Sequence, residues 1–393
     1  MSENKGKYIF NNAKPEKIKV SSDAEISVVT TIDDFRDFFK VSWTVYQNNK
    51  YWVPAFWGET KDFFKSKELF WKHSKTKLFT AYKNNKPVGR IASFIDEYFF
   101  DQDNKKIGFF GFFECIDDYN IASALFNEAE KWLKSKGITQ MQGPINGRAD
   151  VGSGFVIKGF DHLPYLIGHY SQPYYIDFAE KYNLRKSKDL VSYHVDLSKS
   201  IPSKVKETAK RCEESGIKIR PFNRFKFKSE MDWWLKMFLE EFSDHWGYTD
   251  VSLEEVKTRF GIKQLRWILD TGLFLVAEID NKPIGFRWTL PDYNQVFKKL
   301  DGKLGLIGSI KVLFTRHKIN RGRFIVMGIK KKYRGKGIGT CMNYHNLVEM
   351  KKRGYVSAEY GWIDENNIAS RKAGENIGGT HYKTYRVYEK DLI

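Results

Sequence analysis

Residues 324–348 read FIVMGIKKKYRGKGIGTCMNYHNLV, and this stretch decides the fold. The apolar start of the stretch predicts a strand, and the helical spacing of apolar side chains further on predicts a helix over 339–354. The turn between them contains three glycines: Gly335, Gly337 and Gly339. Glycines allow a tight turn and a close approach to a ligand, and the backbone amides that open a helix point at one spot. The stretch therefore predicts a phosphate-binding loop between a strand and a helix.

Two other phosphate-binding signatures fit this loop poorly. A Walker loop ends in Gly-Lys followed by Ser or Thr, whereas Lys336 is followed by Gly337. A dinucleotide fingerprint needs a βαβ context with an acid that binds the ribose, and the strand predicted over 355–363 does not supply that context. The loop therefore belongs to some other class of phosphate site.

The positive charge of the chain is concentrated around this loop. The 393 residues carry 66 Lys and Arg against 48 Asp and Glu, a net charge of +18. Between Lys298 and Lys336 there are 13 basic residues and one acid, Asp301, so +12 of that charge lies in one stretch. A density of this kind predicts an anionic partner, which leaves nucleic acid, a membrane surface or a phosphorylated ligand.

Length and composition exclude several classes of protein. A chain of this length suggests two domains, and 41% hydrophobic residues are enough for real cores. Three cysteines without a CxxC pair support neither a disulfide scaffold nor a structural zinc site, and we expect no metal. The N-terminus lacks the apolar core of a signal peptide, and no run of about 18 apolar residues exists. We therefore expect a cytoplasmic protein.

The two halves of the chain repeat one layout. Residues 78–94 and 273–290 both read as hairpins that start with Leu-Phe and turn at Asn-Lys-Pro-(Val/Ile)-Gly. In each half the hairpin follows a Trp-rich helical stretch and precedes a strand, a helix and another strand. This order predicts two α+β domains of one architecture. The predicted parts are a tail over 1–20, a first domain over 21–198, a linker over 199–214 and a second domain over 215–393.

The second half resembles the GNAT (Gcn5-related N-acetyltransferase) family over about 273–392. Arg334, Gly337 and Gly339 fill the defining places of the family's motif A, [Q/R]-x-x-G-x-[G/A]. Asn367 and Ser370 match the family's "EN-x-x-S" helix. The resemblance implies a mixed, mostly antiparallel twisted sheet flanked by helices in each domain.

The first half resembles a second copy of the same fold that has lost its phosphate loop. At the equivalent place, 114–120, it has three acids and no glycine, which makes a poor pyrophosphate site. The chain as a whole therefore resembles the double-GNAT layout, in which a degenerate copy supports an active one. Phrases such as FGFFECIDD (110–118) are similar to a bacterial group that resembles ceramide synthases, enzymes that N-acylate a sphingoid base.

The resemblance implies acyl-CoA or acetyl-CoA as a co-substrate, with no permanently bound cofactor. The strand over 326–329 is expected to pair with pantetheine and to offer an amide to the thioester oxygen, and the loop is expected to hold the pyrophosphate. The implied cofactor-binding residues are Val326, Met327, Gly328, Ile329, Arg334, Gly335, Lys336, Gly337, Ile338, Gly339, Thr340, Asn367 and Ser370.

Direct transfer to a primary amine needs a base for the ammonium and an acid for the leaving thiolate. The family's usual acid, a tyrosine, is missing, because Gly374 stands in its place. The candidate catalytic residues are Glu359 as the base, Tyr382 or Tyr385 as the acid, and His245 in the acceptor pocket. Packing roles for the tyrosines, a structural role for the histidine and a water chain as the base stay open.

An insertion over 291–323 separates two strands that the family joins tightly. Within 303–319, five apolar residues are expected on one helical face, with basic residues around them: Leu304, Ile307, Ile310, Leu313 and Phe314. Such a helix either rests on an anionic membrane, peripherally on its inner face, or packs as a lid on the core. Membrane contact fits a lipid amine acceptor such as a sphingoid base.

Two further functions stay open as alternatives. A non-catalytic double-GNAT module would bind membrane or nucleic acid, although no recognition motif for nucleic acid is present. Aminoacyl transfer, as in the peptidoglycan-bridge enzymes, is the other alternative. Those enzymes usually lack the motif A glycines, which argues against it.

Overall fold

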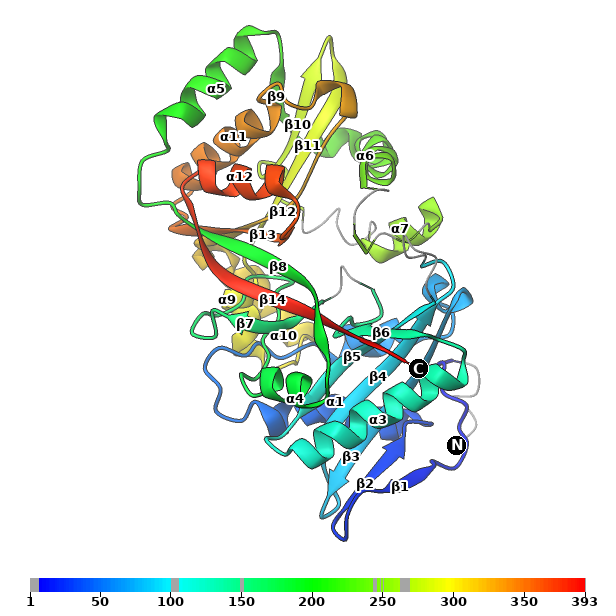
Figure 1. Cartoon of the computed structure of the whole chain (residues 1–393). Helices are drawn as coiled ribbons and strands as arrows, with labels where there is room; N and C mark the ends of the chain where they lie inside the picture. The colour runs from blue at the N-terminus through cyan, green and yellow to red at the C-terminus, as the bar shows by residue number, and fades with distance from the viewer. Residues whose placement is uncertain are drawn as a thin grey trace. The chain divides into compact units, whose positions relative to one another are not determined.

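The computed structural model describes residues 7–99, 106–148, 152–242, 246–247, 249, 251–261 and 269–392 (Figure 1). The chain forms two compact units. Unit 1 comprises the described residues of Met1–Asp189, Phe297–Leu313 and Tyr385–Ile393. Unit 2 comprises those of Leu190–Val296 and Phe314–Thr384.

Unit 1 is built on a sheet in the order β1-β2-β3-β4-β5-β6-β14, with β7 also paired to β14. Along this order from β1 to β14 the neighbouring strands are antiparallel, except that β5 and β6 are parallel. The strands are β1 (Lys17–Lys19), β2 (Ala24–Val28), β3 (Ser74–Lys83), β4 (Lys86–Asp96), β5 (Ile107–Cys115), β6 (Gln140–Gly143), β7 (Phe155–Lys158) and β14 (Gly379–Asp391). The helices are α1 (Ile32–Val45), α2 (Trp57–Phe63), α3 (Tyr119–Ser135) and α4 (Tyr175–Lys181), with a 3-10 turn η1 (Leu69–Lys72).

Unit 2 is built on a sheet in the order β8-β13-β12-β11-β10-β9, in which only β12 and β13 are parallel neighbours. The strands are β8 (Arg185–Asp196), β9 (Lys218–Pro221), β10 (Phe274–Ile279), β11 (Lys282–Pro291), β12 (Arg321–Ile329) and β13 (Ser357–Asp364). The helices are α5 (Ser203–Glu214), α6 (Phe227–Phe242), α7 (Leu253–Arg259), α11 (Ile338–Lys352) and α12 (Ile368–Asn376). The insertion forms α9 (Asn294–Phe297) and α10 (Leu306–Thr315), and short 3-10 turns are η2 (Arg224–Lys226), η3 (Lys298–Leu300), η4 (Arg316–Lys318) and η5 (Lys331–Tyr333).

The α+β class and the two repeated hairpins are confirmed. In β3–β4 the turn is made by Asn84 and Asn85, whose φ angles are 50° and 61°. In β10–β11 it is made by Asp280 and Asn281, with φ of 49° and 58°. Two consecutive residues with positive φ match the twist of a tight antiparallel hairpin, and Asn and Asp tolerate this conformation better than most residues.

The compact units cross the predicted domain boundaries because each unit takes a strand from the other half of the sequence. Most of β8, which lies within the predicted first domain, pairs with β13 in unit 2 through Ser357↔Asp196 to Asp364↔Leu190. The end of β14 pairs with β6 in unit 1 through Tyr388↔Gly143 to Asp391↔Gln140. These strand pairings do not follow the predicted boundaries between two consecutive domains. The division into those domains stays a prediction.

The predicted linker over 199–214 is a packed helix of unit 2. Helix α5 buries Val205, Ala209 and Cys212, which recur at helical spacing on an otherwise charged sequence. Its Ala209 and Cys212 belong to one core cluster with Ile338 and Cys341 of α11, and Figure 1 shows the two helices side by side. Cys341 is fully buried in that cluster. The sequence did not predict this helix, because the apolar stripe of α5 is short and most of its other residues are lysines and glutamates.

The insertion does not pack its apolar face on the core. Helix α10 is shorter than the predicted 303–319 stretch, and its large apolar side chains are exposed. The alternative that this helix is a lid packed through those residues is therefore wrong. No helix within the described ranges is long and apolar enough to cross a membrane.

Candidate active site

Helix α11 begins without a side-chain cap. Gly335 and Gly337 both have φ of 79°, in the left-handed region that glycine adopts at little cost. The first helical hydrogen bond runs from the amide of Cys341 to the carbonyl of Gly337, over 2.9 Å. The amides of Ile338, Gly339 and Thr340 therefore have no partner within the helix, and no side chain at Gly337 caps them. These amides can bind an anion, supported by the helix dipole.

The equivalent helix of unit 1 is closed to an anion. Asp118 caps α3, and its Oδ1 accepts hydrogen bonds from the amides of Asn120 and Ile121 at 3.1 and 3.4 Å. A carboxylate therefore already occupies the place where a phosphate would bind. This local difference matches the expectation that the first half makes a poor pyrophosphate site.

Strands β12 and β13 pair only at their beginnings. Their parallel pairing runs from Arg321↔Ser357 to Phe324↔Tyr360. On its other side β12 stays paired with β11 as far as Gly285↔Ile329, with a register shift that leaves Ile325 unpaired. Beyond Phe324, β12 has no strand partner on the β13 side among the described residues. Such an open edge can accept an extended ligand as an added strand.

A buried ionic cluster lies where the two strands begin to separate. Glu359 and Arg323 are register partners, are 1% and 2% exposed, and form an ion pair of 2.9 Å between Oε1 and Nε. The hydroxyl of Tyr382 on β14 donates to the other carboxylate oxygen of Glu359. His194 of β8 is the register partner of Glu359 on the other side, and its ring lies 5.9 Å from that of Tyr382. Tyr382 is only half-buried, so it links the buried carboxylate to the more open surroundings.

Comparison with known proteins identifies the family. The model of the Acetyltransferase (GNAT) family matches residues 230–378. A protein called "Bacterial ceramide synthase", from Caulobacter vibrioides (strain NA1000 / CB15N), is 30% identical over 382 residues, which are 95% of this chain and 99% of that protein. The chain belongs to the GNAT family. It is an acyltransferase of that family.

Two further proteins are similar to this chain over most of its length. "Protein YghO" of Escherichia coli (strain K12) is 28% identical over 367 residues, 92% of this chain and 93% of that protein. The solved structure of a tandem GNAT protein from the clavulanic acid biosynthesis pathway matches with a TM-score of 0.57 at 10% identity. It covers 94% of this chain and 99% of that one, so it supports the tandem GNAT fold and nothing further.

Within this GNAT fold, the motif A residues have structural partners of their own. The guanidinium of Arg334 pairs with Glu241 at 2.6 Å and donates to the carbonyl of Ile329 at 3.0 Å. A Cβ at Gly339 would lie 3.2 Å from the sulfur of Met327, and one at Gly337 would lie 2.9 Å from Thr208. These glycines therefore let α11 approach β12 and α5 closely.

Asn367, Ser370 and Tyr385 have partners other than the residues of the Glu359 cluster. Asn367 caps α12, and its Oδ1 accepts from the amide of Ser370 at 3.0 Å. Tyr385 belongs to unit 1, where its ring lies 4.8 Å from that of His169. Residues three apart on a strand point to opposite faces, so Tyr385 does not share the side of β14 that Tyr382 uses. His245 lies outside the described residues.

At Gly374, where the family usually has a tyrosine, neighbouring rings occupy the space. A Cβ at Gly374 would lie 3.1 Å from the ring of Tyr360 and 3.3 Å from that of Tyr193. Tyr193 comes from β8, and its hydroxyl donates to Glu375 at 3.0 Å. No tyrosine could therefore be placed at 374 without displacing these rings.

Sequence reasoning missed the cationic residues of this region. Arg323 holds Glu359, and Arg287 of β11 lies between the rings of Phe324 and Tyr360, at 4.4 and 4.6 Å from their centroids. Burial lowers the pKa of Arg287. The available signal was a single arginine inside an apolar strand, which needs a buried partner.

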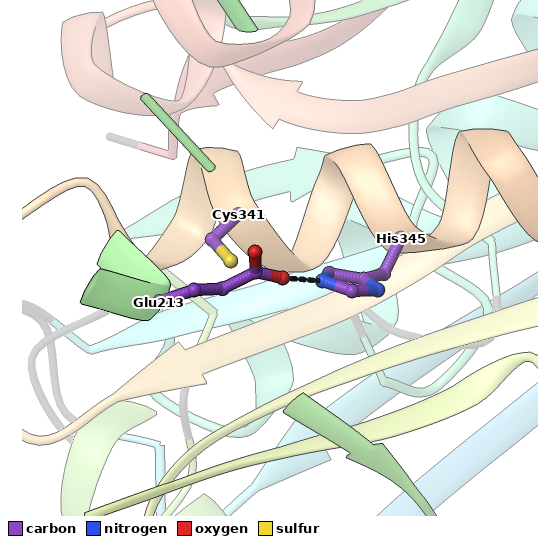
Figure 2. Close-up of side chains that lie close together, drawn as sticks. All are labelled: Glu213, Cys341 and His345. Carbon is purple, nitrogen blue, oxygen red and sulfur yellow. Dashed lines mark hydrogen bonds and ion pairs between the residues drawn. The ribbon is translucent and has the colours of Figure 1, made fainter. Parts of the chain in front are cut away.

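One group of possible metal ligands joins α5 and α11. Glu213, Cys341 and His345 offer ligand atoms that all lie within 4.8 Å of one another, and Figure 2 shows them meeting from the two helices. His345 Nε2 and Glu213 Oε1 are 2.7 Å apart, beside the buried thiol of Cys341. This arrangement is explained by an ordinary side-chain hydrogen bond next to a core cysteine. The expectation of no metal stays a prediction.

A separate pocket of about 380 Å³ lies within unit 2. Its polar lining includes Arg224, Asp270, Arg316 and His317, together with Tyr293 and Tyr355. None of the predicted cofactor-binding or catalytic residues lines it. We assign this pocket no role in acyl transfer.

Proposed function

We propose that the protein transfers an acyl group from acyl-CoA directly to the primary amine of a lipid such as a sphingoid base. One observation carries this proposal: the uncapped, glycine-opened start of α11 is the next helix end after the open edge of β12, with only the short turn η5 between them. The first feature suits a pyrophosphate and the second suits an extended pantetheine arm. Holding a CoA thioester needs both the uncapped helix start and the open strand edge. Helix α3 of unit 1 lacks the uncapped start.

The residues of this site divide by the part of CoA that they would hold. The amides of 338–340, with Gly335 and Gly337 before them, would bind the pyrophosphate, and Lys336 would add charge. Arg334 would contribute only after leaving Glu241, with which it pairs in this structure. Val326, Met327, Gly328 and Ile329 would pair with pantetheine, and an amide among them would stabilise the thioester oxyanion, an effect of about 3 kcal/mol. Asn367 and Ser370 would support the loop from the start of α12.

Glu359 and Tyr382 would handle the protons. Overall, the amine nitrogen forms a bond to the thioester carbon and the carbon–sulfur bond breaks. The ammonium group gives up two protons, of which one ends on the CoA thiolate and the other in solvent. Tyr382 already donates to Glu359, so it can pass a proton to that carboxylate as its own oxygen accepts one from the amine. Arg323 fixes the carboxylate that receives the proton.

A lipid acceptor is supported by the relative named bacterial ceramide synthase and by the exposed apolar helix α10. An amphipathic long-chain amine lies in a membrane, so an enzyme that acylates it gains by working at that surface. We therefore infer a cytoplasmic protein that associates peripherally with the inner face of the membrane.

Two glycine variants test CoA binding. Gly335→Glu places a carboxylate beside the pyrophosphate amides, and Gly354→Glu places the same residue after the other end of α11. The two positions have φ of 79° and 77°, and no atom lies within 4 Å of a Cβ at either, so they carry equal backbone strain. We expect CoA to raise the melting temperature of the native chain and of Gly354→Glu, and to leave that of Gly335→Glu unchanged.

Thiol release then tests the reaction. A series of acyl-CoA donors is mixed with sphingoid bases and with water-soluble amines, and free CoA thiol is measured. Faster release with sphingoid bases supports the proposal. Absence of a CoA effect on the native chain contradicts the CoA site, and release that favours water-soluble amines contradicts the lipid acceptor.

A further inference from the structure

Helix α10 exposes its apolar side chains. Of the eleven large hydrophobic residues that are exposed in the described chain, five lie on this one helix of ten residues. Their exposed fractions run from 46% to 81%: Leu306 81%, Ile307 72%, Ile310 46%, Leu313 55% and Phe314 72%. Isolated exposed apolar residues are ordinary, but a contiguous group marks a surface that contacts something else. We call these five residues the apolar face of α10.

The opposite side of the helix is the one that meets the protein. Gly308 is buried, and Val312 and Thr315 are partly buried. These three recur at spacings of three and four residues, so they form one stripe. A Cβ at Gly308 would lie 2.6 Å from the carbonyl of Lys303, so the segment that leads into α10 runs closely along that side. The helix is therefore attached through a small stripe and presents its larger apolar stripe outward.

Positive charge surrounds the apolar face. Lys303, Lys311, Arg316 and Lys318 are exposed on or next to α10, and Asp301 is the one acid between Lys298 and Lys336. Basic residues around an apolar helical face attract anionic lipid headgroups while the face itself enters the headgroup and acyl boundary.

We propose that the apolar face of α10 docks the protein on an anionic lipid surface, with the surrounding lysines and arginines contacting the headgroups. A second copy of the chain would suit this face less well, because it would bring two strongly basic stretches together. Docking itself does not depend on the acyl-transfer reaction. Only its purpose rests on the proposed function, because a docked helix would hold the enzyme at the surface that contains a lipid amine.

Vesicle binding tests the docking. The native full-length chain should sediment with vesicles of phosphatidylcholine that contain phosphatidylglycerol, and less with pure phosphatidylcholine. The triple variant Leu306→Ser, Ile307→Ser, Phe314→Ser should partition at least about tenfold more weakly. Phe225→Ser is the matched control, since Phe225 is fully exposed on η2 and lies outside the helix. It should sediment like the native chain.

A fluorescent label reports which residue enters the lipid. The three native cysteines are buried, so a dye that senses polarity should react selectively with Phe314→Cys or with the control Phe225→Cys. On anionic vesicles, the emission should shift to the blue for the label at 314 and stay unchanged for the label at 225. Binding of the native chain to neither vesicle, equal binding of the triple variant, or a blue shift only at 225 would overturn the proposal.

Two further readouts keep the outcomes distinct. The CoA-induced rise in melting temperature should persist in the triple variant, which shows that the variant is folded. A native dimer in solution that the triple variant converts to a monomer would overturn lipid docking in favour of a second copy. If CoA has no effect on the native chain but vesicle binding depends on α10, the acyl-transfer proposal fails and the docking surface stands.

Discussion

Glu359 is held by two groups of different kind. Arg323 pairs with one carboxylate oxygen inside the sheet, and the phenol of Tyr382 donates to the other from a half-buried position. An arginine cannot release its proton at physiological pH, whereas a phenol that already donates to a carboxylate is arranged to exchange one. At the scale of single residues, Tyr382 is therefore the group that can move a proton and Arg323 is the group that positions Glu359.

Replacing Tyr382 tests that division. Tyr382→Phe should lower kcat by about 10²-fold or more while the KM for acyl-CoA changes little, because general acid–base groups contribute on that scale. Tyr385→Phe tests the competing tyrosine, and Tyr388→Phe controls for the loss of a buried hydroxyl on the same strand. Steady-state kinetics with a saturating amine measures all three. A larger loss in Tyr385→Phe than in Tyr382→Phe would assign the role to Tyr385.

A second carboxylate, that of the largely buried Glu114, predicts how stability depends on pH. Burial raises the pKa of Glu114 from 4.5 to about 7, partly offset by the charge of Arg90. The folded state therefore keeps a proton that the unfolded state has lost, so the free energy of unfolding should fall as pH rises from 4.5 to about 7, by at most about 3 kcal/mol. Glu114→Gln should flatten that slope, as measured by urea unfolding across this range. An equal slope in both proteins would assign the dependence to other groups.

The two equivalent helices, α3 and α11, differ in how they begin. Both follow a strand of their sheets, and the sequence alone predicted both of them and the hairpins before them, because these features depend on residues close together in the chain. The same local reading predicted the glycine loop of α11. It missed α5, whose apolar stripe of Val205, Ala209 and Cys212 is too short to stand out among charges. Local patterns thus predicted the elements but not all of their packing partners.

The capped start of α3 can be tested by removing its cap. Asp118→Ala should lower the free energy of unfolding by about 1 kcal/mol, since two amides lose their acceptor. Asp117→Ala removes an exposed carboxylate next to it and should change stability little. Urea unfolding of both variants measures the difference. If the two variants are equally stable, the cap does not contribute as proposed.

At the scale of the whole molecule, the chain is two copies of one plan that share strands. The repeated hairpins made the two copies visible in the sequence, but the pairing of β8 with β13 was not predictable. A strand that alternates apolar and polar residues can pair with the edge of either sheet. Its actual partner depends on the register between residues that are far apart in the sequence. For the same reason the sequence did not predict the cluster around Glu359. Its neighbours Arg323 and His194 come from two other strands.

The exchange of strands predicts which fragment can bind CoA. A fragment over 199–393 matches the predicted linker and second domain but lacks β8, so it leaves one edge of β13 without its antiparallel partner. A fragment over 185–393 restores that strand together with His194 and Tyr193. We expect the longer fragment to show a CoA-induced rise in melting temperature and the shorter one to show none or to aggregate. Both fragments contain the whole of motif A. A difference between them therefore reports the contribution of β8 to CoA binding and not that of the loop. An equal rise in both would mean that β8 serves only to connect the two copies and that the second half alone carries the CoA site.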